Sequence, residues 1–231
     1  MSFHRARSEE QIQARIQEIV NAASIIYDSA GYEGLSFSAI SEHTKFTRPN
    51  IYNYFKTKDE ILLIIMKDDF KSFVTSLIKS FKLNKLYSIN EICEIWTNAL
   101  IKHIRLLDLY ALLSTFIEKN VSIKALSEFK KEMAKLQSML LSLISQLFPN
   151  SSDDNVMNFF YFQLTLAFGL YPASKMGKCQ IEALKLAGVS YIPPEFKKTY
   201  QTGLYQLMYC LQNSIYIEKN YNALKKSKKG K

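Results

Sequence analysis

The stretch 47-TRPNIYNYFKTKDE-60 carries two signals for the start of a helix. Thr47 is a suitable cap for a helix whose first turn holds Pro49, because amides in the first turn lack partners and proline has no amide hydrogen. Thr57 and Glu60 have the spacing of a capping box, in which side chains satisfy the first free backbone amides. We therefore predict one short helix after Thr47 and a long helix that begins at Lys58.

The short helix has an apolar side and a polar side. At about 100° per residue, Ile51 and Phe55 share one face, and we expect this face to pack inward together with Phe46. The other sides carry groups that a core does not need, namely Pro49, Asn50, Tyr52 and Asn53. A helix of about two turns is not stable on its own. Neighbouring helices must therefore hold it while its polar side stays exposed.

A further short helix is expected over 37-FSAISEHT-44, with Ser36 as its cap and Phe37 and Ile40 buried. The turn KFT joins it to the helix after Thr47. This arrangement is typical of a helix-turn-helix, whose second helix enters the major groove of DNA and contacts base edges while flanking groups hold phosphates. The pattern leaves one alternative open, a corner of an unrelated helical bundle in which Tyr52 and Tyr54 pack inside.

The composition of the 231 residues is that of a globular helical protein. Apolar residues make up 48% and charged residues 22%, whereas there are only 7 glycines and 5 prolines. Three widely spaced cysteines without a CxxC pair predict neither a disulfide framework nor a zinc site, and they favour a reducing compartment. The N-terminus lacks the apolar segment of a signal peptide, and the most apolar run, residues 158–171, is too short to cross a bilayer. We expect a soluble cytoplasmic protein with no membrane partner.

The net charge of +9 is unevenly distributed. Residues 1–60 hold seven Lys or Arg and eight Asp or Glu, while the tail 221–231 holds five lysines and is expected to be disordered. The overall charge is therefore weak evidence for a nucleic-acid partner. The run from Lys45 to Lys58 is stronger evidence, because it has four cations and no acid.

The rest of the chain has helical periodicity and no sustained strand pattern. A first helix is expected from a capping box at Ser8 to a stop at Gly31, and further helices over 58–81, 88–107, 109–120, 123–148, 153–174, 179–187 and 195–219. The predicted fold is all-α. It consists of a small N-terminal three-helix domain (1–60), a larger C-terminal helical bundle (61–220) and the basic tail (221–231).

Residues 8–62 resemble the DNA-binding domain of the TetR/AcrR family of bacterial transcriptional regulators. GYEGLSFSAI (31–40) stands where the family has G-[FY]-x-x-[TS]-[TS]-x-x-x-I. FTRPNIYNYFKTKDEIL (46–62) is similar to V-[ST]-x-[GP]-x-[LI]-Y-x-[YH]-F-x-[SN]-K-[ED]-x-L at nearly every position. One departure is Thr44-Lys45, where the family usually has Ala-Gly. If Lys45 takes a left-handed conformation, the cost relative to glycine is roughly 1 kcal/mol.

The resemblance implies a role for each matching position. Arg48, Asn50 and Asn53 would face bases, with Pro49 against a thymine methyl. Phosphate contacts would come from Ser38, Lys45, Thr47, Tyr52, Tyr54 and Lys58. The resemblance also implies a C-terminal domain that dimerises and binds a small effector. The predicted function is thus a ligand-responsive transcriptional regulator, a repressor, that binds a palindromic double-stranded DNA operator as a homodimer and is released by an apolar or amphipathic effector.

The sequence holds independent evidence for a dimer. The helix expected over 153–174 is apolar almost all round, and that over 195–219 carries a double apolar stripe. Such helices are buried on two sides, so one side can face the chain's own core and the other a partner. The predicted interface residues are Phe160, Tyr161, Leu164, Phe168, Leu204, Leu207 and Leu211. A large monomeric core explains the same pattern and stays open.

The effector site is harder to predict. Trp96, His103 and Tyr110 fall on one face of the helix expected over 88–107 and of the residues that follow it. One indole, one imidazole and one phenol among aliphatic side chains would suit a flat or amphipathic ligand. An aromatic stripe at helical spacing is also typical of an ordinary core.

No catalytic pattern occurs in the sequence. The three histidines lack ligand spacing to one another or to a cysteine, and no nucleophile elbow, P-loop, HExxH or dinucleotide fingerprint is present. We expect no enzyme, no metal and no cofactor. The second hypothesis that the sequence leaves open is a helical adaptor that binds protein partners and does not bind DNA sequence-specifically.

Overall fold

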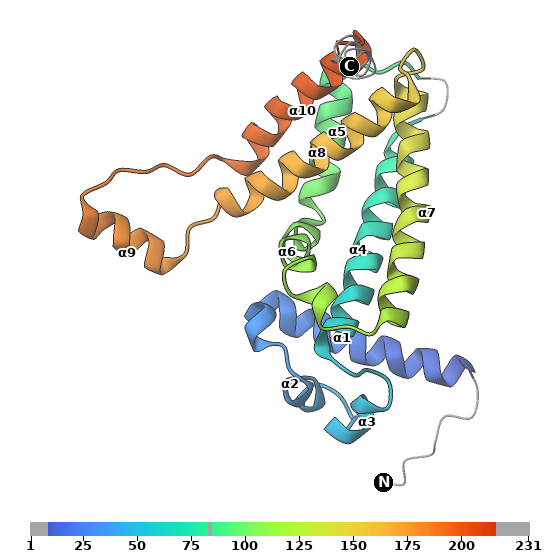
Figure 1. Ribbon diagram of the computed structural model, residues 1–231, viewed down its shortest axis with the longest axis vertical. Coiled ribbons are helices and arrows are strands. Elements are labelled where there is room, and N and C mark those ends of the chain that lie inside the picture. The colour runs from blue at the N-terminus through green and yellow to red at the C-terminus, as the bar shows by residue number, and fades with distance from the viewer. Residues whose placement is uncertain (1–8, 83–84, 216–231) are drawn as a thin grey trace, which may run out of the picture. The chain divides into compact units, whose positions relative to one another are not determined.

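The computed structural model describes residues 9–82 and 85–215, and all regular structure in these ranges is helical (Figure 1). The all-α prediction is confirmed. The elements follow in the order α1 Glu9–Gly34, α2 Phe37–Glu42, α3 Arg48–Tyr52, α4 Lys58–Ser80, α5 Ile89–Ile101, α6 Ile104–Leu113, η1 Ile117–Lys119, α7 Ile123–Leu147, α8 Asp153–Ala173, α9 Lys178–Ala187 and α10 Phe196–Gln212. The predicted cap at Ser8 and the tail 221–231 lie outside the described residues.

Packing divides the chain into two units that alternate along the sequence. The first unit combines residues 1–72 with 103–136, and the second combines 73–102 with 137–231. Both α4 and α7 run without interruption from one unit into the other. The division concerns packing, and the predicted division of functions at residue 60 stays a prediction.

The helix that the sequence predicted over 88–107 is interrupted, and the structure has two helices there, α5 and α6. His103 has φ −120° and ψ 41°, which is not helical. Leu100 on α5 is buried in the second unit, whereas Leu106 and Leu107 on α6 are buried in the first. The turn at Lys102–His103 therefore lies where the chain leaves one core for the other.

The first unit holds the three N-terminal helices. α1 packs on α2, and α2 packs on α3. Gly31 adopts φ 66° and ψ −164°, a conformation that only glycine takes readily, and it interrupts α1 where the sequence predicted a stop. Ile19, Ile40 and Ile51 are fully buried in this core.

The second unit is built around α10, which packs on α8 and α5. Its inward side chains are Tyr200, Leu204, Met208 and Leu211, all without exposure. α10 comes close to α8 at Gly203, where an added Cβ would lie 2.6 Å from a Leu166 methyl. Within the described ranges, no helix is both long and apolar enough to span a membrane.

Candidate DNA-binding surface

α3 is anchored on one side, as its sequence predicted. Ile51 has no exposure, and Phe55 and Phe46 are buried beside it at 5% and 3%. The helix itself is shorter than expected and spans only Arg48–Tyr52. Its geometry continues as a turn, because the amides of Tyr54 and Phe55 both donate to the Ile51 carbonyl, at 3.0 and 3.1 Å.

Most of the predicted DNA contacts lie on the opposite side of this anchor. The exposed residues are Ser38, Lys45, Thr47, Arg48, Pro49, Tyr52 and Asn53, and the half-buried ones are Asn50, Tyr54 and Lys58. Tyr52 is 50% exposed and so does not fill a core. The arrangement presents a cation, two amides, a hydroxyl and a phenol on one short element.

The turn before α3 is free of the strain that Lys45 would introduce in a left-handed conformation. Among the described residues, Ser214 is the only one other than glycine with positive φ. The Thr44 hydroxyl supports the turn by donating to the Ile40 carbonyl at 3.0 Å and accepting from the Phe46 amide at 3.3 Å. Lys45 itself is largely exposed, with its ammonium 3.6 Å from the Glu18 carboxylate.

The two predicted helix caps around the turn behave differently. Ser36 caps α2 as expected, since its hydroxyl accepts from the Ala39 amide at 3.1 Å. Thr47 occupies the cap position of α3, but its side chain makes no capping hydrogen bond. Its hydroxyl therefore lies at the surface without the structural role that the sequence predicted.

Arg48 and Tyr52 hold each other on the exposed side of α3. The Arg48 guanidinium donates to the Tyr52 hydroxyl at 3.4 Å and lies 5.8 Å from the centre of its ring. The Tyr52 ring packs edge-on against Phe37 of α2, with centroids 4.7 Å apart. The position of Arg48 is therefore linked to the buried core through a single aromatic side chain.

Tyr54 and Lys58 are the predicted phosphate contacts that are most engaged within the chain. The Tyr54 hydroxyl accepts from Arg15 at 3.4 Å. The Lys58 ammonium donates to the Tyr32 carbonyl at 2.7 Å and lies 3.8 Å above the Tyr32 ring. An ammonium has three donors, so Lys58 keeps hydrogen atoms for a phosphate while it is held in place.

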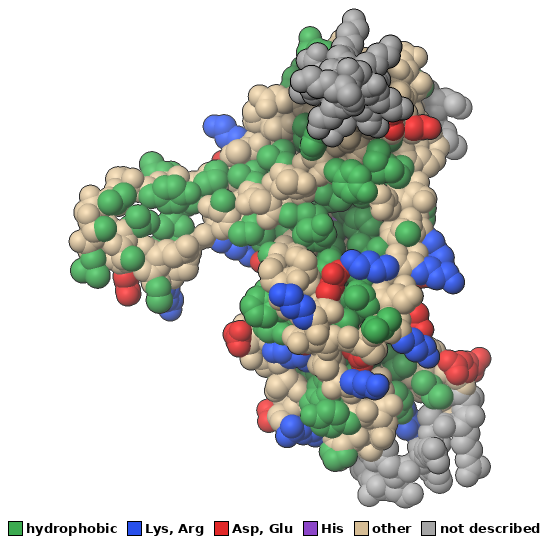
Figure 2. All heavy atoms as spheres, in the orientation of Figure 1, with side chains coloured by type: hydrophobic (Ala, Val, Ile, Leu, Met, Phe, Trp, Pro, Cys, Tyr) green, Lys and Arg blue, Asp and Glu red, His purple; other side chains and the backbone are tan. Residues whose placement is uncertain are grey.

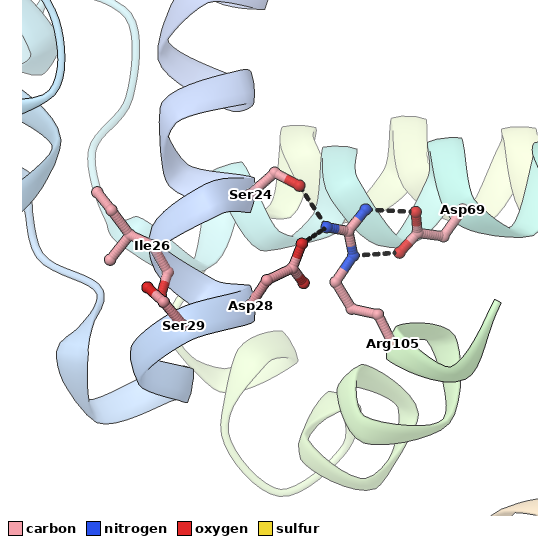
Figure 3. Close-up of polar contacts among 6 residues, drawn as sticks. All are labelled: Ser24, Ile26, Asp28, Ser29, Asp69 and Arg105. Atoms are coloured by element: carbon pink, nitrogen blue, oxygen red, sulfur yellow. Dashed lines mark hydrogen bonds and ion pairs between the residues drawn. The ribbon is translucent and has the colours of Figure 1, made fainter. Parts of the chain in front are cut away.

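Sequence reasoning missed the polar network by which Arg105 joins α6 to α1 and α4. Arg105 of α6 lies between α1 and α4 (Figure 3). Its guanidinium forms a fork with Asp69, at 2.7 and 2.6 Å, and donates to Asp28 at 2.9 Å and to Ser24. These hydrogen bonds, the one to Asp69 above all, raise the pKa of Arg105. The sequence holds a signal for this residue, because Arg105 is the only arginine after Arg48 and stands directly between apolar neighbours, Ile104 and Leu106.

A second link joins α4 to the start of α7. Glu60 accepts from the Lys56 amide at 2.9 Å and from the Ser122 hydroxyl at 2.8 Å. Burial alone would raise the pKa of Glu60, but these hydrogen bonds outweigh it and lower the pKa below its ordinary value. Thr57 accepts from the Glu60 amide at 3.3 Å. The predicted capping box is thus half formed, with the Glu60 carboxylate reaching Lys56 and Ser122.

Asp59 provides a third link, from the start of α4 to the end of α1. It is 4% exposed and accepts from the Tyr32 hydroxyl at 3.0 Å. Burial raises the pKa of the Asp59 carboxyl. Burial of the Tyr32 hydroxyl and its hydrogen bond to Asp59 raise the pKa of Tyr32 to about 12. The bond between Tyr32 and Asp59 thus joins the two ends of the segment that contains α2 and α3.

The three residues predicted to bind an effector are divided between the two units. Trp96 is fully buried in the second unit, in edge-on contact with Phe73 and Phe159. His103 and Tyr110 belong to the first unit, and Tyr110 is 39% exposed. The amide nitrogen of Gln163 is buried without a hydrogen-bond partner. The indole nitrogen of Trp96 makes no well-formed hydrogen bond, but it interacts with the Tyr200 hydroxyl and so counteracts part of the rise in the pKa of Tyr200 that burial causes.

The residues predicted for a dimer interface differ in exposure. Phe160, Leu204 and Leu211 lie inside the second unit, whereas Tyr161 is 54% exposed. The remaining three, Leu164, Phe168 and Leu207, are half-buried. α8 adds an exposed aromatic side chain that the prediction did not list, Phe162 at 50%. Within the described residues, no three His, Cys, Asp or Glu side chains gather as a metal site requires.

Two family profiles match the chain. The profile described as bacterial regulatory proteins, tetR family, matches residues 19–65, and the profile described as tetracyclin repressor-like, C-terminal domain, matches residues 67–212. No curated protein sequence matches the chain.

Solved structures share the fold. A putative TetR-family transcriptional regulator from Syntrophomonas wolfei superposes with a TM-score of 0.52 at 14% identity, over 90% of this chain and 100% of that one. The transcriptional regulator SCO7222, a TetR from Streptomyces coelicolor, gives a TM-score of 0.50 at 11% identity, over 85% of this chain and 97% of that one. At these identities the likeness concerns the fold.

Proposed function

The chain belongs to the TetR family of bacterial regulatory proteins, and we propose that it is a ligand-responsive transcriptional repressor that binds a palindromic operator as a homodimer. The observation that carries this proposal is α3, a five-residue helix with a buried side and a side that displays Arg48, Pro49 and Asn53. The function-bearing part is residues 1–60, and residues 61–220 serve dimerisation and effector binding.

In the proposed complex, α3 lies in the major groove. Arg48, Asn50 and Asn53 contact base edges, and Pro49 contacts a thymine methyl. Arginine pairs with guanine through two hydrogen bonds, and asparagine pairs with adenine in the same way. Phosphates are held by the surrounding donors, Ser38, Lys45, Thr47, Tyr52, Tyr54 and Lys58. Because Arg48 and Tyr52 already touch, the base contact and the phosphate contact are set by one local geometry.

The proposed dimer uses the outer sides of α8 and α10. Tyr161 and Phe162 expose about half of their surface, and exposed aromatic patches of this kind mark interaction sites. Leu164, Phe168 and Leu207 form the half-buried border, and Phe160, Leu204 and Leu211 support the surface from inside. A symmetric pair places two recognition helices about 34–36 Å apart, or somewhat more, on one side of the duplex.

The proposed effector binds in the second unit, near Trp96. A buried donor without a partner costs about 1–3 kcal/mol, and the Gln163 amide nitrogen is such a donor. An acceptor atom on an otherwise apolar ligand would remove this cost. α4 carries the response, because its residues up to Ser72 belong to the first unit and those from Phe73 belong to the second. A ligand that prefers a different position of α4 would weaken operator binding by its differential affinity, typically about 5–150-fold.

The DNA-binding proposal is tested with an operator selected from a random duplex library. Arg48→Ala should weaken binding by about 1–3 kcal/mol and relax preference at one base pair. Tyr52→Phe should weaken all sequences alike. Since the two side chains are hydrogen-bonded, the double variant should cost less than the sum of the single variants. Lys71→Ala, an exposed cation on α4, is the control for net charge and should leave affinity unchanged.

Salt dependence and mass give the second part of the test. With about eight phosphates contacted per dimer, the logarithm of the binding constant should fall with the logarithm of salt with a slope near −7. Light scattering should give twice the chain mass of 26.7 kDa. If the full-length chain bound no duplex above background, the adaptor hypothesis would replace this one.

A further inference from the structure

The arm, which we define as residues 174–195, contains a helix that is specified at both ends. At its start, the Gly177 amide donates to the Gln180 side chain at 2.8 Å. At its end, Gly188 has φ 62° and the amides of Gly188 and Val189 donate to the carbonyls of Lys185 and Leu184, at 3.2 and 3.1 Å. This pair of bonds is a Schellman motif. The sequence therefore defines α9 locally, as a helix of 10 residues.

α9 nevertheless buries nothing within its own chain. None of its residues is buried, and in Figure 1 it stands apart from the bodies of α8 and α10. The arm carries large apolar side chains in the open (Figure 2), namely Ile181 at 40%, Leu186 at 91%, Val189 at 56%, Tyr191 at 52% and Ile192 at 86%. An isolated helix of this length is marginal in water. Its missing packing must come from another surface.

The connections of the arm keep it away from its own core. Residues 188–195 return to α10 without regular structure and include Pro193 and Pro194, and proline pairs favour an extended, stiff chain. Between the arm and the end of α8, a groove of about 520 Å³ lined by Pro172, Leu184 and Tyr191 stays open. Leu186 and Ile192, which do not line this groove, remain exposed at 91% and 86%.

We propose that the arm docks on a second copy of this chain. In the sequence, the arm is inserted between α8 and α10, the two helices whose outer sides form the proposed dimer surface. A second copy seated on that surface lies beside the arm, and two-fold symmetry gives each arm the same seat on its partner. The inference rests on the proposed homodimer and adds to it an exchanged contact made by residues outside the α8–α10 surface.

The native Cys179 provides the test, because it lies on α9 and is exposed. Cys93 is buried, and Cys210→Ser removes the half-buried third thiol. The rate at which a maleimide modifies Cys179 is measured in the full chain at protein concentrations that span the monomer–dimer transition, with light scattering on the same samples. We expect at least a tenfold slower reaction in the dimer. Leu86→Cys, in the Cys179→Ser and Cys210→Ser background, is the control, because position 86 is 96% exposed and should react at one rate throughout.

Each outcome separates the two proposals. If the dimer forms and the Cys179 rate does not change, the arm does not dock, while the dimer stands. If Cys179 is protected equally at concentrations where only monomer is present, the arm packs on its own chain and the inference is overturned. If no dimer forms at any concentration, the proposed dimer fails and the inference fails with it.

A pair of charge substitutions gives an independent measurement. Leu186→Asp and Ile192→Asp place a carboxylate in the proposed contact and should raise the dimer dissociation constant at least tenfold. Ile123→Asp is the matched control, because it changes an equally exposed apolar residue, at 89%, outside the arm. Far-UV circular dichroism of the dilute monomer should be the same for all three variants. Dimer affinity that is unaffected by both arm substitutions would contradict the proposal.

Discussion

α3 and α9 are both too short to persist alone, yet α3 is packed into a core of its own chain and α9 is not. α3 has five residues and no side-chain cap, but Ile51 anchors it in a core without any exposure. α9 has ten residues, well-formed ends and no buried residue. Well-formed ends are therefore enough to define a helix in the sequence, as in α9, whereas burial gives a helix a fixed position, as in α3. The first property can be read locally, and the second depends on the rest of the chain or on a partner.

Ile51→Ala should have the largest effect and would remove the anchor of α3. Loss of a fully buried isoleucine side chain costs about 2–5 kcal/mol, so the urea midpoint of the chain should fall and operator binding should be lost. Leu186→Ala on α9, measured on protein dilute enough to be monomeric, should change the free energy of unfolding by no more than about 0.5 kcal/mol. If the two substitutions lowered the free energy of unfolding equally, α3 and α9 would not differ in how they are packed.

Arg105→Ala should have the next largest effect, because it leaves the carboxylates of Asp28 and Asp69 without their guanidinium partner. Hydrogen bonds to charged groups contribute about 1.5–3 kcal/mol, and we expect a loss of that size in urea unfolding. Arg105→Lys keeps the charge but not the fork that Asp69 accepts, so it should restore less than half of the loss. Full rescue by lysine would show that charge alone matters at this position.

Glu60→Gln should cost about 1 kcal/mol at neutral pH, because the amide cannot accept all the bonds that the carboxylate receives. The pKa of Glu60 is lowered in the folded chain relative to its ordinary value of 4.5. A carboxyl with a lowered folded pKa stabilises the protein above its unfolded pKa, and this stability is lost as pH falls through the folded pKa. The difference between the variant and the parent should thus be constant above about pH 5.5 and shrink below pH 4.5. A difference that grows toward acid pH would have the wrong sign.

Gly188→Ala should have the smallest effect on global stability. Alanine at positive φ costs about 1 kcal/mol locally, but α9 packs on nothing in the protomer, so unfolding of the monomer should shift by no more than about 0.5 kcal/mol. Amide exchange at the end of α9 should become roughly fivefold faster. Gly31→Ala is the counterpart in a packed unit, where the same kind of strain should lower the global free energy of unfolding by about 1–3 kcal/mol.

Local patterns predicted most of the fold. The capping signals, the stop at Gly31 and the helical periodicity indicated the helices in the described ranges except α6, whose span Ile104–Leu113 crosses the predicted boundary between 88–107 and 109–120. The apolar face of α3 was predicted from Ile51 and Phe55. The break at His103 was missed, because α5 and α6 carry one continuous periodic pattern and only the change of core separates them. Long-range pairing cannot be read from periodicity, so the partners of Asp28, Asp69 and Glu60, namely Arg105 and Ser122, also went unnoticed.

The candidate site shows the same limit at the level of single side chains. The sequence placed Pro49, Asn50, Tyr52 and Asn53 away from the apolar side of α3. Pro49, Tyr52 and Asn53 are exposed there, whereas Asn50 is half-buried. It did not show that Tyr54 accepts from Arg15 or that Lys58 is held by Tyr32, because these partners are 39 and 26 residues away. A helical wheel describes the direction of a side chain, while its partner is set by the packing of distant segments.

The alternation of the two packing units has a consequence for how the chain is made. Residues 1–72 leave the ribosome before residues 103–136, which complete the same core. At roughly 5–20 residues per second, synthesis of the intervening and completing segments takes about 3–13 s. During that interval Asp28 and Asp69 lack their hydrogen bonds to Arg105, and Glu60 lacks its hydrogen bond to Ser122. A fragment released after residue 72 stays in this unfinished state, so an excised DNA-binding module needs residues 103–136 joined back to it, with 73–102 replaced by a linker.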